Sequence, residues 1–90
     1  MEQEGIHLSR VKLFAALSDA TRLRIVDVLR HRDGLSSSEI AELLGVSLAL
    51  HCHHAKILSE AGIITKRKEG QTSYLSLNQD FLTSQLSGLL

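Results

Sequence analysis

This 90-residue chain has no proline, no tryptophan and a single cysteine, Cys52. One cysteine cannot form a disulfide within the chain, so a small secreted scaffold held together by disulfides is excluded. Only Phe14, Phe81 and Tyr74 are aromatic, so a core must be built from Leu, Ile, Val and Ala. Hydrophobic residues still make up 43% of the chain, which favours a packed domain over a disordered one. A core of this size supplies only about 3–5 kcal/mol, so small domains usually need a staple or a partner subunit.

Long apolar runs and an excess of one charge are also missing. No apolar run approaches the roughly 18 residues of a membrane span, and the acidic N-terminus lacks the apolar segment of a signal peptide. We therefore expect one soluble, cytoplasmic domain over residues 1–90 that does not contact membranes. Ten Lys and Arg balance ten Asp and Glu. This balance argues against an indiscriminate polycation, but it allows DNA binding where basic residues cluster, as at 66–68.

Apolar periodicity predicts four helices in the first two thirds of the chain. The first two run over about 8–17 and 21–31, with apolar residues along one face. Segment 36–39 (Ser-Ser-Ser-Glu) is a capping box that opens a short third helix. A Gly-containing turn separates this helix from a fourth, about 47–61, which Ser47 caps. Two helices joined by such a turn are typical of a helix-turn-helix, in which the second helix recognises DNA.

The period changes after the fourth helix. A β-branched run begins at Ile63, an alternating run ends at Leu77, and a Gly-containing loop lies between them, so a β-hairpin is predicted over about 63–77. A hairpin directly after a recognition helix is the wing of a winged helix-turn-helix. The predicted fold class is therefore mainly α with a β-hairpin wing, in the order α-α-α-α-β-β-α.

A last helix carries three leucines on one face. This stripe can cover the chain's own core or a second subunit, and we favour a homodimer because the core is otherwise thin. The predicted dimer interface joins the first and last helices through Val11, Phe14, Leu82, Leu86 and Leu89. A two-fold dimer would read an inverted repeat in double-stranded DNA.

The predicted recognition helix divides into two faces. On a 3.6-residue period, Leu50, Ile57 and Leu58 point inward together with Ala61. Small apolar side chains on the outer face can contact thymine methyls, and a histidine can donate to guanine or to a phosphate. An ordinary solvated face is the alternative, but such a face would seldom expose leucine to water. Together with the wing, the predicted DNA-binding residues are Ser47, Leu48, Ala49, Cys52, His53, Lys56, Lys66, Arg67, Lys68 and Gln71.

The His-Cys-His-His run at 51–54 also suggests metal binding or catalysis. His51 and His54 are i, i+3 neighbours that could share an ion, yet a structural zinc needs four ligands, and only two more histidines lie outside the run. We therefore expect no metal and no other cofactor, and a hydrogen-bonded core role for His54. Cys52 with a histidine base is a weak candidate nucleophile, because adjacent helical residues point about 100° apart and no oxyanion donors are evident. An enzyme is not expected.

Three segments resemble the ArsR family, also called ArsR/SmtB, of winged-helix repressors. They are the helix entry 17–26 (LSDATRLRIV), the segment 53–64 (HHAKILSEAGII) and the wing 67–77 (RKEGQTSYLSL), in the family's order. The resemblance implies a homodimer joined through its first and last helices, with recognition helices that enter successive major grooves. It also implies repression that an inducer relieves.

The chain departs from the family at its inducer sites. Ser36-Ser37-Ser38 stands where arsenic-type members carry Cys-x-Cys, so that thiolate site is absent. Zinc-type members carry acids and histidines on the last helix, where this chain has only Asp80. The inducer stays open between oxidation of Cys52, an ion at the histidine run, a small molecule and none. Cys52 lies beside three histidines, a setting that favours thiol oxidation, so a redox sensor is one alternative. A winged helix used for protein interaction is another.

The family resemblance also exposes two differences beneath the recognition helix. His51 stands where the family usually has Val, and Ala55 where it usually has Leu. Both substitutions predict a smaller and more polar core at this point.

Overall fold

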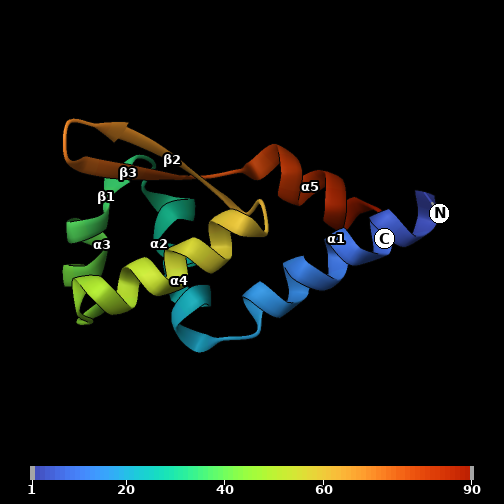
Figure 1. Ribbon diagram of the computed structural model, residues 1–90, viewed down its shortest axis with the longest axis horizontal. Coiled ribbons are helices and arrows are strands. Elements are labelled where there is room, and N and C mark those ends of the chain that lie inside the picture. Colours follow the sequence, from blue (N-terminus) through green and yellow to red (C-terminus); the bar gives the residue numbers. More distant parts are fainter. Residues whose placement is uncertain (1, 90) are drawn as a thin grey trace.

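The computed structural model describes residues 2–89, and the side chains of residues 8–89. The described chain forms five helices and a three-stranded sheet (Figure 1). The predicted order of helices and hairpin is confirmed, with one short strand added. The elements are α1 (Glu2–Leu17), α2 (Ala20–His31), β1 (Leu35–Ser36), α3 (Ser37–Leu44), α4 (Leu48–Glu60), β2 (Ile64–Glu69), β3 (Thr72–Leu77) and α5 (Gln79–Ser87).

The added strand is β1, which the sequence did not reveal. It pairs antiparallel with β3, so that Leu35 lies opposite Leu75 and Ser36 opposite Tyr74, and the sheet order is β1-β3-β2. Two residues are too few to show an alternating pattern, so β1 is defined only by its distant partner. Ser36 also caps α3, which joins the hairpin directly to the helix-turn-helix.

Local side-chain chemistry fixes where the helices begin. Both bonds of the predicted capping box are present: Glu39 N–H donates to Ser36 Oγ, and Ser36 N–H donates to Glu39 Oε1, each at 3.1 Å. Ser47 caps α4 as predicted, since its Oγ accepts from the N–H of Leu50 at 3.0 Å. The start of α1 differs from the prediction. It begins at Glu2 rather than near Leu8. The prediction began too late because the first residues of the helix carry no repeating apolar position.

The core is aliphatic, as the composition predicted. Every helix or strand from α1 to β3 contributes to it, and its most buried members are Leu13, Ile25, Leu29, Ile40, Leu58, Ile63 and Leu75. One inward assignment was wrong: Leu50 is 42% exposed. The inner face of α4 instead presents His51, Ala55 and Leu58. The face is therefore displaced by one residue, because a histidine occupies a core position that hydrophobicity alone would assign to leucine.

Figure 1 shows how the elements are arranged. α1 and α5 lie at the same end of the molecule, and the Arg10 side chain lies next to Gly88 there. The hairpin and α3 form the opposite end, and α4 runs between the two ends. In the described part of the chain, no helix has the length and apolar character to cross a membrane.

Candidate nucleic-acid interface

The outer face of α4 collects the helix residues predicted to contact DNA. α4 packs against α1, α2, α3 and β2, and its inner side chains are buried there. The opposite side is open to solvent, so the structure brings these predicted residues together on one exposed face. They are Ser47, Leu48, Ala49, Cys52, His53 and Lys56.

The wing divides its basic residues between two sides. Lys66, Arg67 and Lys68 are consecutive and exposed on β2, but successive strand residues point to opposite faces. Arg67 turns toward Tyr74, whose ring centre lies 5.3 Å from the guanidinium carbon, and its Nε lies 3.2 Å from Glu69 Oε1. Lys66 and Lys68 therefore share the other face, and neither forms an ion pair among the described residues.

A small hollow connects the outer face of α4 to the wing. Its volume is about 190 Å³. The hollow brings together three segments that are far apart in the sequence, and most of its lining groups are hydroxyls or amides. The lining residues are Ser37, Ser38, Leu48, Cys52, Gln71, Thr72 and Ser73.

The sequence analysis missed four of these lining residues. Ser37 and Ser38 were interpreted as part of a capping box and as the place of the family's missing Cys-x-Cys, and Thr72 and Ser73 as part of a strand. Their sole signal was an abundance of hydroxyls at a helix N-terminus and beside a Gly-containing turn. Hydroxyls and the free N–H groups of a helix N-terminus are donors that suit a phosphate.

His51 and His54 do not share an environment, although both lie on the inner face of α4. His51 is fully buried, and neither of its ring nitrogens has a hydrogen-bond partner in the part of the chain that the structure describes. Burial lowers the pKa of His51, and the nearby Lys66 and His54 lower it further. Among the described side chains of residues 8–89, no three His, Cys, Asp or Glu residues are grouped so that they could hold a metal ion.

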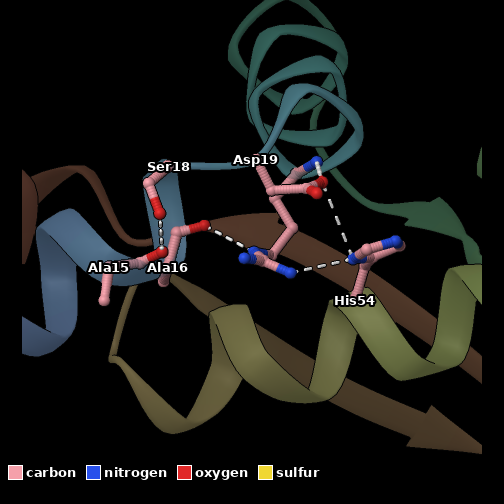
Figure 2. A network of polar contacts seen from close by, with 6 residues as sticks. Ala15, Ala16, Ser18, Asp19 and His54 are labelled. Carbon is pink, nitrogen blue, oxygen red and sulfur yellow. Dashed lines mark hydrogen bonds and ion pairs between the residues drawn. The ribbon is translucent and has the colours of Figure 1, made fainter.

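His54 has the hydrogen-bonded core role that the sequence predicted. It is 8% exposed, and its Nδ1 lies 3.1 Å from Arg22 Nη1 and 3.8 Å from Asp19 Oδ2 (Figure 2). Arg22 Nε donates to the carbonyl oxygen of Ala16 at 2.6 Å. Asp19 caps α2, and the hydrogen bond from the backbone N–H of Arg22 lowers the pKa of Asp19.

An exposed apolar stripe runs along α1 and α5. Val11 is 62% exposed, Phe14 43%, Leu86 38% and Leu89 55%. Leu82 differs from these four because it packs partly against the chain's own core. Of the leucines on this stripe, Leu82 thus covers the chain's own core, whereas Leu86 and Leu89 face outward.

Known proteins are similar to this chain in both sequence and fold. A family model described as a helix-turn-helix domain matches residues 17–67. The transcriptional repressor SdpR of Bacillus subtilis (strain 168) is 36% identical over 78 residues, which are 87% of this chain and 86% of SdpR. The arsenical resistance operon repressor of the same organism is 35% identical over 74 residues, 82% of this chain and 70% of that repressor.

The comparison with solved structures also finds transcriptional regulators. The structure of an ArsR-like transcriptional regulator from Rhodococcus sp. RHA1 has a TM-score of 0.85 and 29% identity, and the match covers 94% of this chain and 79% of that one. These relatives are regulators of transcription and not enzymes, in agreement with the sequence analysis. The chain belongs to the ArsR family of winged helix-turn-helix transcriptional regulators.

Proposed function

We propose that this protein is a transcriptional repressor that binds double-stranded DNA as a homodimer. The observation that carries the proposal is the continuous exposed surface formed by the outer face of α4, the hollow and the wing. Two relatives, SdpR and the arsenical resistance operon repressor, are repressors by name, which supports the same role here. We place its action in the cytoplasm, as one domain over residues 1–90.

Each part of this surface has a distinct task in the proposal. Leu48 and Ala49, in the first turn of α4, meet base edges in the major groove, where their small apolar groups suit thymine methyls. Lys56 and Lys68 contact phosphates, and the hydroxyls that line the hollow donate to phosphate oxygens of the DNA backbone between these two contacts. Phosphate contacts position the protein, whereas the first turn of α4 selects the sequence.

The homodimer is proposed from the stripe on α1 and α5. A domain gains stability when it covers exposed apolar side chains such as these, and each buried side chain of this type contributes about 1.5–3 kcal/mol. An isologous contact would join Val11, Phe14, Leu86 and Leu89 to the same residues of a second copy. The two recognition helices would then face half-sites of an inverted repeat whose centres lie roughly 34–36 Å apart.

A redox sensor is the second candidate, and the exposure of Cys52 in the hollow favours it. Oxidation to a sulfenic acid would place a polar oxygen where the proposed DNA approaches. The setting is less basic than the sequence suggested, because His51 turns into the core and away from the outer face.

A salt titration of binding to duplex DNA separates the repressor from a winged helix that serves only as a protein-interaction module. Phosphate binding falls steeply with salt, and Lys56→Ala should flatten the slope of log K against log salt by about one. Arg30→Ala is the control, because Arg30 is an exposed cation on α2 that pairs with Asp27 and lies on neither α4 nor the wing. Equal slopes for all three proteins, or no binding to any duplex, would contradict the proposal.

A further inference from the structure

We propose that Arg22 is a positioning residue for DNA binding: it fixes the recognition helix to the end of α1 through His54, and it can do so only while His54 is neutral. This inference rests on the proposed DNA-binding function. It assigns a role in DNA binding to Arg22 and His54, two residues that do not lie on the proposed DNA-contacting face.

The contacts of Arg22 join three helices. Its Nε donates to Ala16 O, in the last turn of α1, at 2.6 Å. Its Nη1 lies 3.1 Å from Nδ1 of His54 on α4, and its own backbone N–H donates to Asp19 Oδ2 at the N-cap of α2 at 3.0 Å. Figure 2 shows Ala16, Asp19 and His54 converging on this point from separate elements. A single planar guanidinium thus sets the spacing between α1 and α4.

Donor and acceptor chemistry fixes the protonation state of His54. Arginine has five N–H donors and no acceptor, so Nδ1 of His54 must accept, and the ring proton is on Nε2. A second proton would turn Nδ1 into a donor that faces the donors of Arg22. The nearest acceptor, Asp19 Oδ2, is 3.8 Å away, so Nδ1–H would gain this carboxylate only after the Arg22 contact had opened.

The titratable and charged groups near His54 lie on α2 and its N-cap, on α4 and on β2. Arg22 and Asp19 face it from α2. On α4 itself, the ring of His53 lies 5.2 Å away in an edge-to-face arrangement, and His51 lies one turn earlier. Lys66 of β2 lies near His51, and its charge contributes to lowering the pKa of His51. Among the described residues, the carboxylate of Asp19 is the acceptor toward which Nδ1–H of His54 would turn.

The contact of Arg22 with Ala16 and His54 matters because α1 and α4 have different tasks in the proposed dimer. α1 carries Val11 and Phe14 at the proposed subunit interface, whereas α4 carries the proposed DNA-contacting face. The distance between the two recognition helices therefore depends on how α4 is held relative to α1. Binding to two half-sites with fixed spacing is sensitive to that distance.

The test compares affinities for a duplex enriched from a random pool. The wild type is the reference, and every variant keeps His53, because that residue lies on the proposed DNA-contacting face. His54→Asn keeps an acceptor close to the position of Nδ1 and cannot be protonated, whereas His54→Leu removes the acceptor. Arg22→Lys keeps the charge but loses the planar fork that reaches two acceptors.

We expect His54→Leu and Arg22→Lys to bind about tenfold more weakly than the reference, the equivalent of one charged hydrogen bond. The His54→Asn variant should bind like the reference. When the pH is lowered from about 8 to about 5.5, the reference should lose affinity and His54→Asn should not. Thermal melting at both pH values confirms that each variant is folded.

Three results would overturn the inference. A folded His54→Leu protein with reference affinity would show that the contact between Arg22 and His54 serves stability alone. Equal acid sensitivity of His54→Asn would remove the protonation step. An imidazole ¹⁵N spectrum with the proton on Nδ1 would overturn the Arg22 contact even if DNA binding holds. A folded protein that binds no duplex at about pH 8, yet shows the Nε2–H tautomer, would instead overturn the proposed function and with it the positioning role.

Discussion

Replacing His51 by valine should stabilise this protein. The side chain is fully buried, and both ring nitrogens lack a hydrogen-bond partner among residues 8–89. A buried polar group left without a partner costs about 1–3 kcal/mol. Valine, the residue that the family usually carries here, has no polar atom to desolvate, and its helix propensity is similar to that of histidine. The smaller side chain leaves a small cavity that costs up to about 1 kcal/mol. We expect the free energy of unfolding to rise by about 1–2 kcal/mol.

The gain should increase in acid. Burial lowers the pKa of His51 below its ordinary value of 6.5, so the unfolded chain takes up a proton at a pH where the folded protein does not. The stability of the wild type therefore falls as pH drops below about 6.5, by at most about 1.4 kcal/mol per pH unit from this group, and levels off below the folded-state pKa. Valine removes this contribution.

Urea denaturation at about pH 7.5 and about pH 5.5 measures both effects, with protein concentration held fixed because subunit association also contributes to stability. His53→Val is the matched control, since the same substitution is made two residues along the same helix at an exposed position. A His51→Val protein that is less stable than wild type at both pH values, with an unchanged pH dependence, would refute the reasoning.

Four further predictions concern assembly and ligands. Leu86→Asp should give a monomer or an unfolded chain, and sedimentation as an intact dimer would contradict the proposed interface. Substitution of Ala49 should change which duplex is preferred, whereas Lys68→Ala should weaken all duplexes about equally; competition between duplexes distinguishes the two patterns. Arsenite should not bind tightly in calorimetry, because one cysteine per subunit supplies at most two thiolates per dimer. Peroxide should weaken DNA binding by about 1–3 kcal/mol and leave Cys52→Ser unaffected, and equal losses in both proteins would remove the redox role.

Features determined by neighbouring residues could be predicted from the sequence. The bonds of Ser36 and Ser47 to nearby N–H groups depend only on residues within one helical turn, and both caps are present. Features that depend on distant partners could not be predicted. β1 exists because Leu35 finds Leu75, and the inner face of α4 is displaced by one residue because the fold buries a histidine.

The candidate site follows the same rule. The outer face of α4 is a property of one helix, so its period was sufficient to group Leu48, Cys52 and Lys56. The hollow needs three segments to meet, and Ser37 and Thr72 carried no sign of one another in the sequence. The basic residues of the wing were predicted as one cluster, but the alternation of a strand sends Arg67 to the opposite face.

Selection from a pool of random duplexes, followed by sedimentation of the complex, tests the central claim most directly. A dimeric repressor should enrich an inverted repeat whose half-site centres lie roughly 10–10.5 base pairs apart, and the complex should contain two copies of the chain. Enrichment of no palindromic sequence by a folded protein, or a complex with a single copy, would contradict the account.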